Sequence, residues 1–391
     1  MKKVGIISMQ RIINYGSFLQ SYGLYSTIKK IGYDVNFIDY HYDGTLVDIK
    51  KTPFLKKILR NLNMIDFLKK RQHNKKFKEQ ITNALKEIGV NDDYNYDKNI
   101  DSLVIGSDEV FNCMQGFPVG YSLELFGKGF ENKNIISYAA SFGYTTAEML
   151  KKYNKETEIG DLLNKFNAIS VRDENSYKIV ENLCNRKSYI NLDPVLIADY
   201  SKFIKNERPI KENYIIIYAY PKWFTKEEQK YIKLFARKHN KKIISLGFYQ
   251  EIADYNLPIS PFDVFTYFKY ADYVITDTFH GTIFSIKVNT KFCTIVRKSN
   301  LNKLSYLLKT LEQEDRMVRK LEDIETLYDK KINYEKTNLI IKNETEKSIH
   351  YLQENIWGDF KWRKNQEKNI CLRIQYFFQL EILVLKLLTF F

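Results

Sequence analysis

The chain has 391 residues, which is enough for two domains of ordinary size, and 44% of them are hydrophobic. This composition excludes a disordered chain, because it supplies enough apolar surface for folded cores. The formal net charge of +14 suits nucleic acid, anionic lipid or an anionic substrate, and a lysine-rich genome accounts for it equally well. No nucleic-acid-binding motif or repeat is visible, so we expect no nucleic acid partner.

The four cysteines are widely spaced along the chain and form no CxxC pair. Cys113, Cys184, Cys293 and Cys371 therefore predict reduced thiols in a cytoplasmic protein, with no zinc or other metal site. The apolar run 4–9 is too short for the hydrophobic region of a signal peptide. We expect the chemistry of this chain to need no cofactor.

The first half of the chain reads as the opening of a parallel sheet. An apolar run at 4–7 predicts a strand, helical spacing follows over 18–31 and stops at Gly32, and 35–38 predicts the next strand. Further strands are predicted at 101–105, 135–139 and 168–171. The segments that follow these strands are small and polar, as is typical of binding loops at the carboxyl ends of strands.

Residues 50–80 form a basic amphipathic insertion. An apolar stripe at Leu55, Ile58, Leu59, Leu62, Ile65 and Leu68 is surrounded by lysine and arginine. Such a helix can lie on an anionic membrane or pack its stripe on its own domain, and the pattern leaves both open.

The second half repeats the α/β pattern. A polar segment over 200–211 predicts an interdomain linker, strands are predicted at 214–218 and 242–246, and helices at 225–239, 262–268 and 345–357. We therefore expect an α/β fold of two Rossmann-like domains facing across a cleft, with a C-terminal helical tail. The expected ranges are 1–200, 212–345 and 345–391.

Residues 271–296 are the most informative stretch. An apolar run at 273–275 ends in a polar cluster containing His280, an amphipathic stretch resumes at once, and a second apolar run follows at 292–296. Ligands of parallel α/β sheets bind at such strand ends, against helix N-termini. His280 is one of only five histidines, so we expect it to lie at the functional site.

The last 21 residues, 371–391, are strongly apolar but are interrupted by Arg373, Glu381 and Lys386. These charges argue against a spanning helix and favour an interfacial one, on the inner face of the cell membrane. The alternative is a helix docked on this protein or on a second copy of it in a homo-oligomer.

Six segments, in this order and spacing, resemble the polysaccharide pyruvyl transferase family over about residues 1–300. They are 14–22 (NYGSFLQSY), 104–112 (VIGSDEVFN), 137–143 (SYAASFG), 170–173 (SVRD), 192–194 (LDP) and 276–281 (TDTFHG). The resemblance implies a two-domain fold of the GT-B type. It also implies an enzyme that transfers a pyruvyl ketal group from phosphoenolpyruvate to a sugar hydroxyl, with the donor on the C-terminal domain and the acceptor on the N-terminal one.

By this resemblance, the motif histidine falls on His280 and the donor-binding arginine on Arg172. Some relatives carry an arginine two residues before the histidine, where this chain has Thr278. Either Arg297 or Lys298 replaces that cation, or the donor differs. Backbone N–H groups at the helix start can also hold a phosphate, which places Asp277, Thr278 and Gly281 on the donor side.

The side chains suggest roles with open alternatives. A histidine serves as acid or base near neutral pH, so His280 is the catalytic candidate; otherwise it is a neutral side chain bonded across the turn. Arg172 is the anion clamp or a salt-bridge partner of Asp173 or Glu174. Asp277 orients His280 or, as we favour, caps the following helix.

The acceptor candidates come from the first half of the chain. Tyr15 can stack on a sugar ring, Asn14 can bond hydroxyls, and Gly16 either floors the site or permits a turn. Ser107 and Asp108 can bond hydroxyls, and Ser107 can alternatively cap a helix.

The sequence favours a pyruvyl transferase that uses phosphoenolpyruvate and acts on a cell-surface glycan or its lipid-linked precursor. The alternatives are a GT-B glycosyltransferase that uses a nucleotide sugar, and a non-catalytic glycan-binding or assembly protein whose donor site has decayed.

Overall fold

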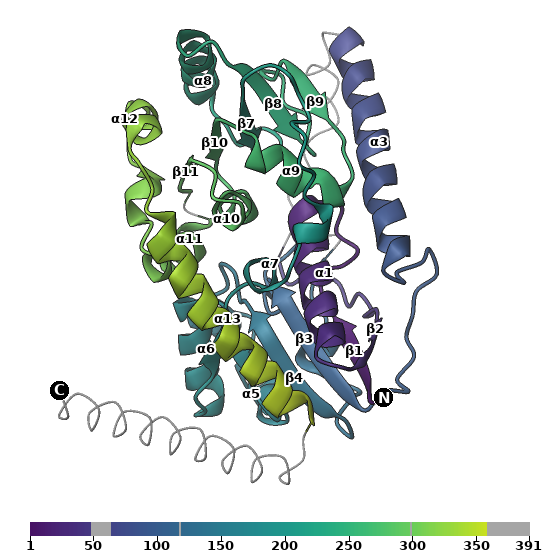
Figure 1. The fold of residues 1–391 in the computed structure, drawn as a ribbon. Helices are drawn as coiled ribbons and strands as arrows, with labels where there is room; N and C mark the ends of the chain where they lie inside the picture. Colours follow the sequence, from purple (N-terminus) through teal and green to yellow (C-terminus); the bar gives the residue numbers. More distant parts are fainter. Residues whose placement is uncertain (48–63, 117–118, 298, 358–391) are drawn as a thin grey trace, which may run out of the picture.

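The computed structural model describes residues 1–47, 64–116, 119–297 and 299–357, and it contains two six-stranded sheets (Figure 1). The first sheet has the order β2-β1-β3-β4-β5-β6, and every neighbouring pair is parallel. Its strands are β1 (Lys3–Ile7), β2 (Asp34–Phe37), β3 (Ser102–Asp108), β4 (Asn134–Ala140), β5 (Ser170–Val171) and β6 (Tyr189–Ile190).

The second sheet has the order β12-β11-β10-β7-β8-β9 and is also parallel throughout. Its strands are β7 (Tyr214–Tyr218), β8 (Lys242–Leu246), β9 (Tyr255–Leu257), β10 (Tyr273–Thr276), β11 (Phe292–Ile295) and β12 (Met317–Val318). Two parallel sheets with helices confirm the predicted α/β fold of two Rossmann-like halves, and strands β7 and β8 have the predicted bounds.

Helices connect the strands in both halves. Those of the first half are α1 (Tyr15–Lys30), α3 (Met64–Glu87), η1 (Leu123–Phe126), α4 (Ala147–Lys152), α5 (Glu156–Asn164), α6 (Glu174–Cys184), α7 (Pro194–Ile197) and η2 (Ser201–Phe203). Those of the second half are α8 (Lys226–Lys238), η3 (Pro261–Asp263), α9 (Val264–Lys269), α10 (Phe279–Lys287), α11 (Leu301–Thr310), η4 (Glu314–Arg316), α12 (Asp323–Asp329) and α13 (Tyr334–Trp357).

Helix α1 shows how capping sets the bounds. It begins at Tyr15, earlier than hydrophobic spacing predicts, because the Asn14 side chain accepts a hydrogen bond from the N–H of Ser17 at 2.7 Å. It ends just before Gly32, whose φ of +102° favours glycine, as expected for a residue that follows a helix.

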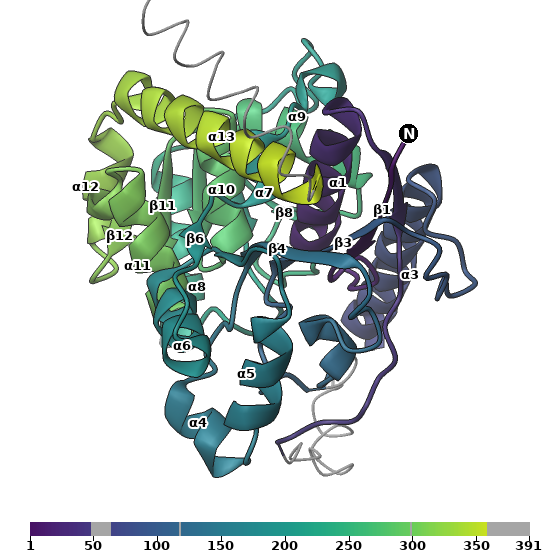
Figure 2. The same cartoon turned by 90° about the horizontal axis from the view of Figure 1, so that it is seen from below.

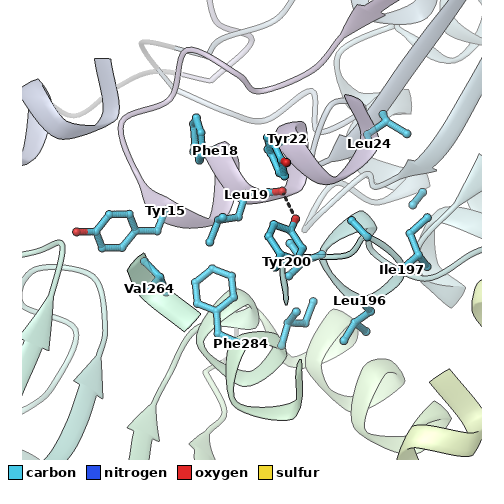
Figure 3. Close-up of a cluster of buried hydrophobic side chains, with 14 of the residues drawn as sticks. Tyr15, Phe18, Leu19, Tyr22, Leu24, Leu196, Ile197, Tyr200, Val264 and Phe284 are labelled. Atoms are coloured by element: carbon cyan, nitrogen blue, oxygen red, sulfur yellow. Dashed lines mark hydrogen bonds between the residues drawn. The ribbon is translucent and has the colours of Figure 1, made fainter. Parts of the chain in front are cut away.

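A continuous hydrophobic cluster joins the two halves. It includes Phe18, Leu19 and Tyr22 on α1, and Val264 and Phe284 on the second half (Figure 3). The chain between the halves takes part in this core: the Tyr200 hydroxyl donates to the carbonyl of Leu19 at 2.7 Å. The interface is therefore packed like a domain interior.

Helix α13 returns from the second half and lies along the first sheet, as both views show (Figures 1 and 2). The Tyr351 hydroxyl donates to the carbonyl of Ser137 at 2.8 Å, and the Ser102 hydroxyl donates to the carbonyl of Ile356 at 2.9 Å. The helix is longer than the predicted 345–357, because its first turns lie on the second half.

Helix α3 also links the halves. It lies beside the second sheet in Figure 1, although its sequence falls between β2 and β3 of the first. The ring of His73 bonds to the carbonyl of Gly247 at 2.6 Å, and Phe77 packs on Tyr15 and Phe248. The apolar stripe at 55–62 and the tail at 371–391 lie outside the described residues. Within the described residues, no helix is long and apolar enough to cross a bilayer.

Candidate functional site

A cavity of about 290 Å³ lies where the carboxyl ends of the two sheets face each other. Residues that follow β1, β3 and β4 form one side of it, and residues that follow β7, β8, β10 and β11 form the other. Four of the residues singled out from the sequence line this cavity together with His280: Asn14, Gly16, Asp108 and Thr278. The two halves of the fold thus build one site, as parallel sheets predict.

His280 sits in the first turn of α10 and is 8% exposed. The helix starts there because the Thr278 hydroxyl accepts a hydrogen bond from the N–H of Gly281 at 3.0 Å. Its imidazole lies directly on the backbone of α1: a Cβ added to Gly16 would stand 2.3 Å from Nδ1. Gly16 is therefore needed for this close approach rather than for a turn.

The partner of His280 is Asp193, to which the sequence assigned no role. Nε2 of His280 lies 3.6 Å from Oδ2 of Asp193, within ion-pair range, while Oδ1 of Asp193 accepts from the N–H of Val195 at 3.0 Å. Burial alone would raise the pKa of Asp193, but the nearby His280 and Arg172 outweigh it and lower that pKa to about 2. Asp193 is thus a buried anion beside the histidine ring, and Nε2 of His280 has no hydrogen-bond partner among the described residues.

Arg172 lies behind this pair and does not line the cavity. Its guanidinium donates to Asp193 at 2.7 Å and to Asp108 at 3.1 Å, so the predicted alternative of a salt bridge to Asp173 or Glu174 is wrong. Asp173 instead caps α6. Burial disfavours the charged guanidinium, yet Asp108 and Asp193 raise the pKa of Arg172 above its ordinary value.

Asp277 has neither of its predicted roles. Thr278 caps α10, and the carboxylate of Asp277 pairs with Arg297 at 3.1 Å instead of with His280. Arg297 also forms a bidentate salt bridge with Glu228, with distances of 2.7 and 2.8 Å. Arg297 does not line the cavity. Burial, opposed by Arg297, raises the pKa of Asp277 to about 7. The other predicted cation, Lys298, lies outside the described residues.

Lys303, on α11, lines the cavity and was missed in the sequence because it lies 23 residues beyond His280. Its ammonium donates to the carboxylate of Glu109 at 2.6 Å, across the cleft between the halves. Burial would raise the pKa of Glu109, but Lys303 and Asn112 lower it to about 2. Among the described lining residues, Lys303 is the only lysine or arginine.

Three helix N-termini meet at this cavity, since the capping residues of α1, α10 and α11 all line it. These are Asn14, Thr278 and Asn300. The first N–H groups of a helix have no intrahelical partner, and the summed peptide dipoles favour negative charge there. The cavity is therefore suited to bind an anion.

Two predicted acceptor residues point elsewhere. The Tyr15 ring is 1% exposed and its hydroxyl donates to the carbonyl of Ile259 at 2.8 Å, so it is not available to stack on a sugar. Ser107 is fully buried and donates to the side chain of Gln20, not to a helix end. Sequence position after a strand does not show whether a tyrosine lines a cavity or packs in the core. Either kind of tyrosine can occur in the segment that follows a strand.

Aromatic side chains line part of the cavity. Tyr220, Trp223 and Phe248 line it from the second half and Tyr144 from the first. Trp223 is 37% exposed and Tyr144 is 43% exposed, so both retain apolar surface for a ligand. Aromatic rings of this kind accept the apolar face of a sugar or a base.

A comparison with known protein families identifies the family of this chain. The family model "Polysaccharide pyruvyl transferase" matches residues 14–299, a range that contains His280, Asp193 and Arg172. The chain belongs to the polysaccharide pyruvyl transferase family. A search of curated proteins found no match.

One solved structure supports the fold of this family member, and two others are similar at lower scores. A putative UDP-N-acetylglucosamine 2-epimerase from Listeria monocytogenes superimposes with a TM-score of 0.50 at 10% identity, covering 90% of this chain and 97% of that one. UDP-GlcNAc 2-epimerase from Neisseria meningitidis gives 0.47 at 10% identity, covering 92% of this chain and 100% of that one. The calicheamicin glycosyltransferase CalG4 gives 0.44 at 11% identity, covering 92% and 99%. The two facing parallel sheets and the match to the Listeria structure support a GT-B-like fold.

Proposed function

We propose that this protein transfers a pyruvyl group from phosphoenolpyruvate to a sugar of a cell-surface glycan or of its lipid-linked precursor. The observation that carries the proposal is the convergence of three helix N-termini, Lys303 and the His280–Asp193 pair in one cavity. A small donor with a phosphate and a carboxylate needs such a set of N–H groups and a cation, together with one acid–base group.

Charge balance supports a small anionic donor. Both carboxylates that line the cavity have an ion-pair partner: Glu109 pairs with Lys303, and Asp108 shares Arg172 with Asp193. The positive ends of α1, α10 and α11 are therefore not cancelled by an unpaired acid. They supply the charge that an arginine at position 278 would otherwise provide. The Lys303 ammonium has three N–H donors, so it can bind the donor while it keeps its contact with Glu109.

In the proposed reaction, C3 of phosphoenolpyruvate gains a proton and C2 becomes electrophilic. One sugar hydroxyl forms a bond to C2, the bond from C2 to the phosphate oxygen breaks, and a second hydroxyl of the same sugar closes the ketal. The two hydroxyl protons end on the new methyl group and on the released phosphate. His280, held by Asp193, is placed to move these protons.

Calorimetric titration with phosphoenolpyruvate tests the donor. We expect saturable binding by the wild type and at least about tenfold weaker binding by Lys303→Gln, since a charge-assisted contact contributes on the order of 1.5–3 kcal/mol. Lys309→Gln, on the same helix but not lining the cavity, serves as the matched control. Arg172→Ala tests the family's donor role for that residue. A folded wild type that does not bind phosphoenolpyruvate would refute the proposed donor.

The aromatic wall of Tyr220, Trp223 and Phe248 favours one alternative, a glycosyltransferase that uses a nucleotide sugar, because a base can stack there. Against it, the cavity of about 290 Å³ lies at the lower end of ligand-site volumes. The same titration with UDP-glucose separates the two functions. Binding of neither ligand would favour a non-catalytic glycan-binding protein.

We also propose that residues 371–391 bring the enzyme to the inner membrane face, since that segment is apolar and follows a basic stretch at 361–368. Full-length protein should float with anionic phosphatidylglycerol vesicles, and a chain ending at residue 370 should not. If truncation leaves flotation unchanged but turns a dimer into a monomer in light scattering, the tail is a subunit contact instead.

A further inference from the structure

A second cavity, of about 170 Å³, shares a wall with the catalytic one. The loops that follow β1 and β2 form it at the carboxyl end of the first sheet, together with Tyr94 from the segment between α3 and β3. Met9 and Ile12 line both cavities, so ligands bound in the two cavities would lie next to each other. The family resemblance assigned no role to this second cavity.

The polar groups of the second cavity form a closed network. Arg11 contacts both carboxylate oxygens of Asp39, at 2.6 and 2.7 Å, and donates to the carbonyls of Asn91 and Asp93 at 2.9 and 3.0 Å. Four of the five N–H donors of a guanidinium are thus in use. Asp39 in turn accepts from the N–H of Asn95 at 2.8 Å. The cation is neutralised, so the cavity suits an uncharged ligand.

Tyrosine side chains supply the remaining walls. Tyr94 and Tyr42 line the cavity and stay 60% and 47% exposed. The guanidinium of Arg11 lies 4.3 Å from the centroid of the Tyr94 ring and holds that ring in place. Tyr40 donates its hydroxyl to the carbonyl of Val119 at 3.3 Å. Fixed aromatic rings beside hydroxyl groups match a pyranose, which has apolar faces and a polar rim.

We propose that this second cavity is a subsite for an uncharged sugar next to the one that receives the pyruvyl group. The inference rests on the proposed function, since it takes the first cavity as the reaction site. It assigns the acceptor to a class: an oligosaccharide, free or lipid-linked, with a neutral residue adjacent to the modified one. A monosaccharide would leave the cavity at Arg11 and Tyr94 empty.

The test uses full-length protein on an array of uncharged glycans of one to four residues, read as apparent affinity. We expect the wild type to bind two-residue glycans at least about fivefold more tightly than their constituent single sugars, as one aromatic contact provides. Tyr94→Ala should lose this gain, and Tyr94→Phe should keep it. Tyr255→Ala, which removes an exposed tyrosine that lines neither cavity, should bind like the wild type.

Equal affinity for one- and two-residue glycans, or an unchanged length preference in Tyr94→Ala, would overturn the subsite. Phosphoenolpyruvate binding measured on the same preparations keeps the two proposals apart. If the length preference depends on Tyr94 while phosphoenolpyruvate does not bind, the subsite stands and the proposed donor fails. If phosphoenolpyruvate binds and the length preference is absent, the donor stands and the subsite fails.

Discussion

At the scale of single residues, the site depends on two close approaches that side-chain chemistry alone does not reveal. The imidazole of His280 lies against the backbone at Gly16, where any side chain would collide with it. On its other side stands Asp193, a carboxylate that is fully buried and stays ionised because Arg172 and His280 surround it. The position of the histidine is therefore set by a glycine and an aspartate from two other segments.

Gly16→Ala should reduce kcat for pyruvyl transfer by about 100-fold. The new Cβ would stand 2.3 Å from Nδ1 of His280 and displace the ring, and a shift of about 1 Å at a reacting group costs roughly that factor. Steady-state kinetics with phosphoenolpyruvate measure the effect. Gly5→Ala is the control, because its Cβ would crowd only the side chains of Ile38 and Ile100. Unchanged kcat in Gly16→Ala would contradict the role of this contact.

In Asp193→Asn, the unfolding free energy should fall less steeply than in the wild type as the pH is lowered. The folded pKa of about 2 lies below the ordinary aspartate value of 3.8, so the stabilisation is present above pH 4 and is lost as pH falls towards 2. A difference of this size amounts to about 2 kcal/mol of unfolding free energy. Urea titrations between pH 5 and 2 compare the variant with Asp161→Asn, an exposed site on α5. If the unfolding free energies of the two variants changed equally with pH, the result would be evidence against the buried ion pair of Asp193.

At the scale of elements, α3 holds the two halves together beside the site. Phe77 is 4% exposed and packs on Tyr15 of α1 with a centroid distance of 5.0 Å and on Phe248 at 5.5 Å. Phe248 lines the cavity that contains His280. One helix of the basic insertion therefore supports the wall of the site, so its packing role does not depend on membrane contact.

Phe77→Ala should cost about 3–5 kcal/mol of unfolding free energy, because it empties a contact between α1 and the second half. Leu68→Ala, on the same helix but 56% exposed, should change stability by less than about 0.5 kcal/mol. Denaturant unfolding compares the two variants. A similar small effect in both would show that α3 is not needed to hold the halves together.

At the scale of the whole molecule, the two sheets do not behave as separate units. The hydrophobic cluster runs from α1 through Tyr200 to α10, and α13 crosses from the second half to the first. Lys303 and Glu109 bridge the cleft at the cavity itself. These three connections hold the two walls of the cavity in a defined relation, as the proposed transfer between a donor and an acceptor would require.

Leu352→Ala should lower the stability of both halves together, by about 2–5 kcal/mol, since Leu352 is fully buried in the cluster that joins them. Calorimetry should show one unfolding transition that moves to lower temperature. Lys342→Ala, at an exposed position of α13, should leave it in place. Two separated transitions in the Leu352 variant would mean that the halves unfold independently of each other.

The sequence by itself determined the longer strands, the order of the family segments and the placing of His280 at a strand end, because hydrophobic spacing and capping act between neighbouring residues. It did not predict the short strands β6, β9 and β12. The identity of the family followed from six short segments. The tertiary structure alone decided that Asp193 faces His280, that Lys303 reaches Glu109, and that Tyr15 and Ser107 are turned away. Those contacts join residues far apart in the chain, and only the packing of two sheets against each other determines which side chains meet.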